Sequence, residues 1–172
     1  MPNSPEDKRK VISGIILAWI LSTAFLGLGG LISYKLDLFA ARSLYEILAL
    51  TFMPPALSLA AGIAWAARTR HFKQNIDGSA PSAGSPLDIT LRYIQNTAEQ
   101  TVLFILMVFC CLGAMPAFSQ TMLPVLGIWF FIARMMFWVG YRQSPVSRAA
   151  GFAATFHPIL FFLLISIAAF IL

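Results

Sequence analysis

Charged side chains are scarce in this sequence. They make up 11% of the 172 residues, with 12 Lys and Arg against 7 Asp and Glu, whereas a soluble globular domain carries about 25%. So little charge cannot cover a water-soluble particle, and this excludes a soluble globular domain. The hydrophobic content of 59% and the mean hydropathy of +0.79 instead predict an integral membrane protein with one membrane domain, in contact with a lipid bilayer.

Cysteine and histidine are equally rare, and their scarcity limits the chemistry. Cys110 and Cys111 are adjacent within an apolar run, so we expect them to pack as small hydrophobic residues rather than to bridge each other. The two histidines have no carboxylate or thiolate at ligand spacing, which predicts no metal site. There is no glycine-rich phosphate loop. The net charge of +5 comes without a basic, aromatic-rich patch, so no nucleic-acid partner is expected.

Five apolar segments are long enough to cross a bilayer, which requires about 20 residues each. They are Val11–Tyr34, Leu44–Ala67, Arg92–Ala114, Thr121–Tyr141 and Gly151–Leu172. The segments lack the period-two alternation of membrane β-strands, so we predict an all-α membrane bundle. The first segment has no good cleavage site after it and is predicted to be a retained helix. The stretch 78–86, rich in Gly, Ser and Pro, predicts a flexible cytosolic loop within 68–90.

Lysine and arginine are distributed unequally between the two sides that five spans create. One side carries eight: Lys8, Arg9, Lys10, Arg68, Arg70, Lys73, Arg142 and Arg148. The other carries only Lys35 and Arg42. By the positive-inside rule we predict a cytosolic N-terminus and a C-terminus on the opposite side. The short loops, without sorting motifs, favour a bacterial inner membrane.

Four polar residues open the third apolar segment: Arg92, Asn96, Glu99 and Gln100. Their spacing places them on one face of a helix. A charged side chain in a bilayer costs at least ~2.5 kcal/mol, so a membrane helix carries one where a function or a partner requires it. Arg134 lies in the next, antiparallel segment, at the same depth as Glu99, roughly 10 Å from the inner face. We predict an ion pair between Glu99 and Arg134.

Two interpretations of these charges stay open at this point. The ion pair can be purely structural, Arg92 can extend to the interface, and Arg142 and Arg148 can be topological anchors. The functional interpretation depends on the convergence of several side chains in one layer near the inner face. They are Arg92, Asn96, Glu99, Arg134, Tyr141 and Arg148. Such a layer suits a small anionic ligand with several donors and acceptors.

Two blocks of this polar layer resemble the MAPEG family, the membrane-associated proteins in eicosanoid and glutathione metabolism. The first is RYIQNTAEQ, which begins at Arg92 and resembles the family signature R-x-x-x-N-x-x-E. The second runs from Arg134 through Phe137 to Gly140 and Tyr141. An arginine follows seven residues later, as in the family, and a basic pair after the second apolar segment is also in the family's place. The resemblance covers residues 44 to 172.

The resemblance implies a left-handed four-helix bundle that assembles as a homotrimer, with glutathione bound between subunits near the cytosolic face. The chain then divides into residues 1–43, a cytosolic tail and an additional transmembrane helix, and residues 44–172, the MAPEG-like membrane domain. The additional helix has no counterpart in the family's four-helix pattern.

The family's roles carry over to matching positions. Arg92 and Asn96 are expected to hold the polar ends of glutathione, and Glu99 its amino group or an arginine. Tyr141 is expected to hydrogen-bond the ligand, and Arg148 matches the arginine that stabilises the thiolate. Arg68 or Arg70 is a weaker match to the family's other site arginine. Gln100 and Arg134 complete the predicted binding set. A guanidinium favours the thiolate form of a thiol, whose free pKa is about 8.5, so the catalytic role of Arg148 is electrostatic.

Two departures from the family pattern affect the predicted function. Phe137 stands where much of the family has Tyr, and Gln100 stands where the leukotriene branch has Tyr. Leukotriene synthesis is therefore not expected. We predict a glutathione-dependent transferase or peroxidase that acts on a hydrophobic electrophile or a lipid hydroperoxide. The alternatives are a non-catalytic protein that serves assembly or binds a lipid-like ligand, and a transporter that uses Glu99 and Arg134 as a charge relay.

Overall fold

In the computed structural model, residues 4–72, 77–144 and 146–172 are described. They form five α-helices: α1 (Pro5–Lys35), α2 (Leu44–Phe72), α3 (Pro86–Ala114), α4 (Pro116–Gln143) and α5 (Arg148–Ile171). Each helix is long and apolar enough to cross a membrane, and the described residues include no strand. The predicted all-α membrane bundle with five spans is therefore confirmed.

The connection between α2 and α3 is shorter than the predicted loop 68–90. Helix α2 continues to Phe72, and α3 already begins at Pro86. The early start of α3 has a local cause, because the Ser85 hydroxyl accepts a hydrogen bond from the backbone N–H of Asp88 at 3.2 Å. A capped N-terminus followed by proline is a strong helix start. The predicted segment began later, at Arg92, because it was defined by its apolar residues and the first turns of α3 are polar.

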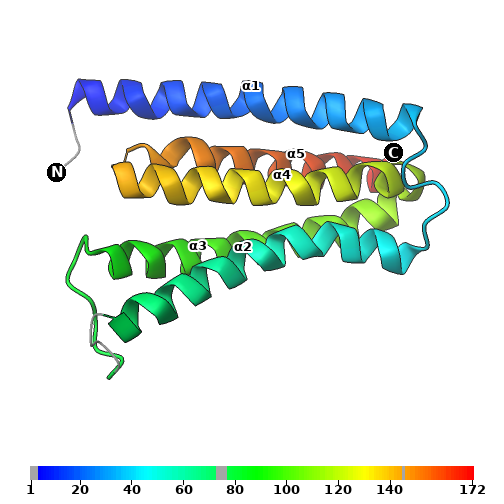
Figure 1. The fold of residues 1–172 in the computed structure, drawn as a ribbon. Helices are drawn as coiled ribbons and strands as arrows, with labels where there is room; N and C mark the ends of the chain where they lie inside the picture. Colours follow the sequence, from blue (N-terminus) through cyan, green and yellow to red (C-terminus); the bar gives the residue numbers. More distant parts are fainter. Residues whose placement is uncertain (1–3, 73–76, 145) are drawn as a thin grey trace.

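The helices alternate in direction and form two groups around α4, which contacts each of the other four helices. Figure 1 shows α2 and α3 crossing on one side of α4, and α1 lying along the opposite side. Helix α1 packs only on α4 and α5 among the described elements. The additional helix therefore covers the outer side of a four-helix bundle formed by α2 to α5.

The segments that carry most of the basic residues lie at the same end of the bundle. The start of α1, the α2–α3 connection and the α4–α5 turn are together at one end in Figure 1, and the α1–α2 and α3–α4 connections are at the other. This grouping is the one that the distribution of Lys and Arg requires. The cytosolic location of the basic end stays a prediction.

A side chain from α4 bonds to the carbonyl that a proline leaves unpaired inside α5. Pro158 has no N–H to donate to the carbonyl of Ala154 one turn earlier. The indole N–H of Trp129 donates to that carbonyl instead, at 2.8 Å, and Trp129 is buried. In a bilayer, where water cannot satisfy a free carbonyl, this bond keeps α5 regular and fastens it to α4.

A second proline lies at a close backbone contact between α2 and α4. Pro55 likewise cannot donate to the carbonyl of Thr51, which is fully buried. Gly127 of α4 packs directly against this carbonyl, and a Cβ at position 127 would collide with the carbonyl oxygen of Thr51. Glycine at this position allows the two helix backbones to approach closely, as small residues do in membrane bundles.

Candidate functional site

Arg134 is fully buried between α3 and α4. Its Nη2 donates to Oδ1 of Asn96 at 2.9 Å, and its Nε donates to Oγ1 of Thr97 at 3.2 Å. The guanidinium also lies over the ring of Phe137, with 4.2 Å between Cζ and the ring centroid. A buried cation is tolerated when donors are matched by acceptors and aromatic faces. Arg134 thus joins α3 to α4 through an amide and a hydroxyl rather than through a carboxylate.

The predicted ion pair between Glu99 and Arg134 is wrong. Glu99 is exposed, and its Oε1 accepts from Nε2 of Gln95 at 3.3 Å. A helix turns by about 100° per residue, so Asn96 and Thr97 define an arc that faces α4, and Glu99 lies about 60° or more outside it. Along the axis of α3, the partners of Arg134 lie within one helical turn of Glu99. The rotation assumed for α3 about its axis was wrong, and the proposed charge relay loses its basis.

A second group, the Tyr141 cluster, consists of Arg92, Tyr141 and Arg148 near the basic end. Arg148, at the start of α5, places its Cζ 4.6 Å from the centroid of the buried Tyr141 ring. Arg92, from the first turns of α3, lies within electrostatic range of the Tyr141 hydroxyl and pairs with Asp88, Nε to Oδ1, at 3.0 Å. Both arginines are exposed. The cluster therefore presents two guanidinium groups around one phenol at an accessible surface.

The short α4–α5 turn sets the position of Arg148. A Cβ at Gly140 would lie 2.6 Å from the carbonyl oxygen of Ser147 and 3.2 Å from the backbone nitrogen of Arg148. A Cβ at Gly151 would collide with the backbone of Phe137. The two glycines allow α4 and α5 to pack in direct backbone contact. This contact brings Arg148 over Tyr141 although seven residues separate them in the sequence.

A layer of aromatic rings supports the cluster, and sequence analysis did not identify it. The ring of Tyr93 stacks on Trp138 with 4.6 Å between centroids, and its hydroxyl donates to the carbonyl of Ser58 at 2.8 Å. Arg142 lies against two indoles, 4.6 Å from Trp65 and 4.8 Å from Trp138. The sequence indicated only a topological role for Arg142. The spacing of tryptophans on two different helices gave no sign that both would contact it.

The other predicted binding residues occupy different environments. Gln100 is buried, and its Oε1 has no hydrogen-bond partner. Arg68 is exposed and lies near the rings of Trp65 and Phe72, at 5.9 and 5.7 Å. Arg70 is half-buried and lies within electrostatic range of Asp77. The structure thus brings Arg92, Tyr141 and Arg148 together. It places Arg134 and Gln100 inside the bundle and leaves Asn96 half-buried beside Arg134.

Comparison with known proteins identifies a family. Residues 43–168 match the family model described as MAPEG family. This range contains α2, α3, α4 and most of α5, and it leaves α1 outside. No curated protein and no solved structure matched the chain. The match confirms the resemblance that the two polar blocks indicated.

Proposed function

The chain belongs to the MAPEG family, and from this membership and the geometry of the Tyr141 cluster we propose that it is a glutathione-dependent membrane enzyme. Its activity is that of a transferase or peroxidase, and its second substrate is a hydrophobic electrophile or a lipid hydroperoxide from the bilayer. The observation that supports this most directly is the position of Arg148, 4.6 Å from the ring of the buried Tyr141. The working form is a homotrimer, as the family implies.

Glutathione is an anionic tripeptide with two carboxylates, one amino group and one thiol. Arg92 can bind a carboxylate in bidentate fashion, as guanidinium groups do. The exposed carboxylate of Glu99 is available to the amino group. Arg68 and Arg70 extend the positive field at the same end of the bundle. A site for a water-soluble co-substrate requires exposed charged groups that are held by a rigid scaffold. The helical bundle provides this scaffold.

Arg134, Asn96 and Gln100 take a different part in this proposal. Arg134 is 0% exposed and Gln100 is 4% exposed, so a ligand at the surface of the bundle does not reach these two. Asn96 is half-buried, and its amide oxygen is already bonded to Arg134. We assign all three to positioning, with the bond between Arg134 and Asn96 holding the face of α3 that carries Arg92. This assignment replaces the direct binding role that the family pattern implied.

The role of Arg148 is electrostatic. A guanidinium close to the sulfur favours the thiolate over the thiol of bound glutathione. In the transferase reaction the sulfur lone pair forms a C–S bond with the electrophile, and the displaced group leaves with the electron pair. In the peroxidase reaction the sulfur attacks the hydroperoxide, the O–O bond breaks and an alcohol leaves after protonation. A second glutathione then reduces the oxidised sulfur and yields the disulfide and water.

The experiment is a titration of glutathione into the purified protein in detergent, with thiolate absorbance in the ultraviolet followed at neutral pH. We expect a saturable thiolate signal that Arg148→Ala abolishes. Arg142→Ala is the matched control, since Arg142 lies near the same turn but contacts Trp65 and Trp138. Its signal should equal that of the unmodified protein.

A folded oligomer without a thiolate signal would overturn the proposed activity. It would favour the second candidate, a non-catalytic member of the fold that serves assembly or binds a lipid-like ligand. One observation supports that candidate: Phe137 is buried under the guanidinium of Arg134 and contributes no hydroxyl to the polar layer.

A further inference from the structure

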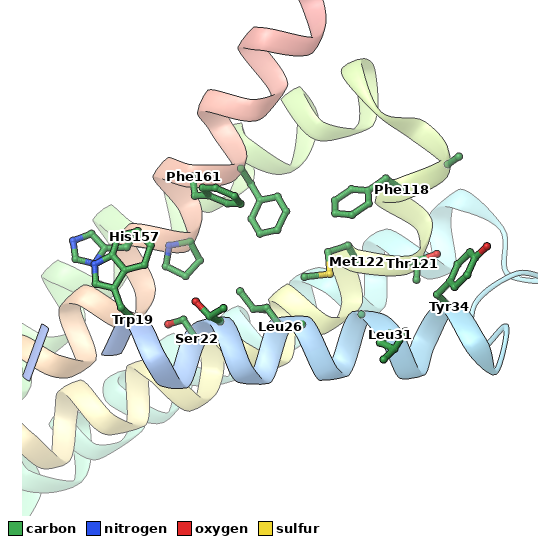
Figure 2. Close-up of a pocket in the computed structure, with 16 residues that line it drawn as sticks. Trp19, Ser22, Leu26, Leu31, Tyr34, Phe118, Thr121, Met122, His157 and Phe161 are labelled. Carbon is green, nitrogen blue, oxygen red and sulfur yellow. The ribbon is translucent and has the colours of Figure 1, made fainter. Parts of the chain in front are cut away.

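A groove of about 810 Å³ lies between α1, the first turns of α4 and the middle of α5. Figure 2 shows its aromatic and aliphatic walls, with Phe118 and Phe161 facing Leu26 and Met122. Its volume is within the range of about 300–1,000 Å³ that is typical of small-molecule sites. Since α1 lies outside the family match, the groove depends on the helix that this chain adds to the bundle.

The end of the groove near the middle of α1 carries two polar groups. A surface that contacts only hydrocarbon chains does not need them. The Ser22 hydroxyl is buried without a hydrogen-bond partner, and Ser22 is only 5% exposed. Nδ1 of His157 is also buried without a partner. The imidazole stacks on Trp19 with 4.9 Å between centroids, which holds it beside the groove. Two polar groups at one end of an apolar groove are the arrangement that orients a ligand.

The position of these groups along α1 indicates what kind of ligand they fit. Tyr34, near the end of the helix, follows Ser22 by twelve residues, and this corresponds to about 18 Å of helix. Tyr34 and Thr121 line the opposite end of the groove (Figure 2). A ligand that fits both ends has a polar head beside Tyr34 and Thr121, an apolar chain along the groove, and a second polar atom near Ser22 and His157.

We propose that this groove binds a long acyl chain that carries a hydroxyl group in mid-chain, with the hydroxyl hydrogen-bonded to Ser22 and His157. The Ser22 hydroxyl can donate and accept, and a neutral imidazole offers one donor and one acceptor. An unmodified acyl chain fills the groove equally well but leaves both groups unpaired. The site lies toward the end of the bundle opposite the Tyr141 cluster and does not depend on the proposed glutathione chemistry.

The test uses ricinoleate and oleate, two fatty acids that differ by one mid-chain hydroxyl. The intact protein is incubated with an equimolar mixture, and native mass spectrometry measures the ratio of the two complexes and the oligomeric state. One additional hydrogen bond corresponds to a preference of about tenfold for ricinoleate. We expect Ser22→Ala to reduce this preference to about twofold or less. Ser13→Ala is the control, because the Ser13 hydroxyl is exposed on the same helix and bonds to the Arg9 carbonyl.

A second variant fills the groove. Gly27 lines it, and a Cβ at this position would meet no atom within 4 Å, so Gly27→Phe inserts a ring without a backbone collision. We expect this variant to lose both fatty acids while its oligomeric state is unchanged. Equal binding of the two fatty acids to the unmodified protein would overturn the proposal. So would a Gly27→Phe variant that retains both fatty acids, or one whose oligomer dissociates, which would show that a second copy of the chain occupies the groove.

Discussion

Asn96→Ala tests the arrangement of polar groups around Arg134. The amide oxygen of Asn96 accepts from Nη2 of Arg134 at 2.9 Å, and the guanidinium is 0% exposed with Nη1 unpartnered. Alanine removes an acceptor from a buried cation, so the contact between α3 and α4 should weaken. Glu99→Ala is the matched control, because it also introduces alanine within one turn of α3 but removes an exposed side chain.

Two ranges of measured values bracket the expected loss. Hydrogen bonds to charged groups contribute about 1.5–3 kcal/mol in proteins, whereas polar contacts between membrane helices average about 0.6 and reach about 1.7 kcal/mol. The bond from Arg134 is short and charge-assisted, and its donor is fully buried. We therefore expect Asn96→Ala to lower the free energy of unfolding by about 1.5 kcal/mol. Glu99→Ala should cost less than about 0.5 kcal/mol, the size of a helical i,i+4 pair.

The assay is reversible unfolding in mixed micelles with an increasing fraction of sodium dodecyl sulfate, followed by tryptophan fluorescence. Thr97→Val extends the series, since it removes the second acceptor of Arg134 while it keeps the side-chain shape. Equal or greater destabilisation by Glu99→Ala than by Asn96→Ala would contradict the assignment of Asn96 as the partner of Arg134. That result would restore the ion pair between Glu99 and Arg134 that the sequence predicted.

Two further substitutions test the contacts between α4 and α5. Trp129→Phe removes the donor to the carbonyl of Ala154, and we expect a loss of about 1–3 kcal/mol in the same unfolding assay. Pro158→Ala supplies an N–H to that carbonyl, so the double variant should recover part of the loss, and strict additivity of the two changes would contradict this account. Gly140→Ala places a methyl group 2.6 Å from the carbonyl oxygen of Ser147, which should cost about 1–3 kcal/mol and weaken glutathione binding through displacement of the turn. Unchanged glutathione affinity would show that the turn does not set the site.

The Tyr141 cluster was the part of the candidate site that sequence reasoning located best. Tyr141 and Arg148 flank a short turn, so their proximity depends on local sequence and on two glycines that allow a close approach. Arg92 comes from another helix, and only its depth could be inferred. The structure supplies the rotation of α3 that brings it near the Tyr141 hydroxyl.

The groove beside α1 could not be predicted. Sequence analysis identified α1 as an additional membrane helix but had no means to assign its neighbours, because its exterior is apolar on every side and no helical face is marked. The packing of α1 on α4 and α5 places Ser22 and His157 at one end of a shared groove. Their separation in the sequence carries no sign of this relation.

Composition and the distribution of Lys and Arg were enough to predict five membrane-spanning helices and the end of the bundle at which most of the positive charge lies. These properties follow from composition and helical rise, since transfer into hydrocarbon is a local cost paid residue by residue. Which faces of the helices meet became known only from the tertiary structure. Asn96 rather than Glu99 contacts Arg134, and Trp129 donates to the carbonyl of Ala154 that Pro158 leaves unpaired. Gly127 of α4 packs against the backbone of α2. Helix rotation depends on close packing and on partners for buried polar groups, and both are properties of several segments together.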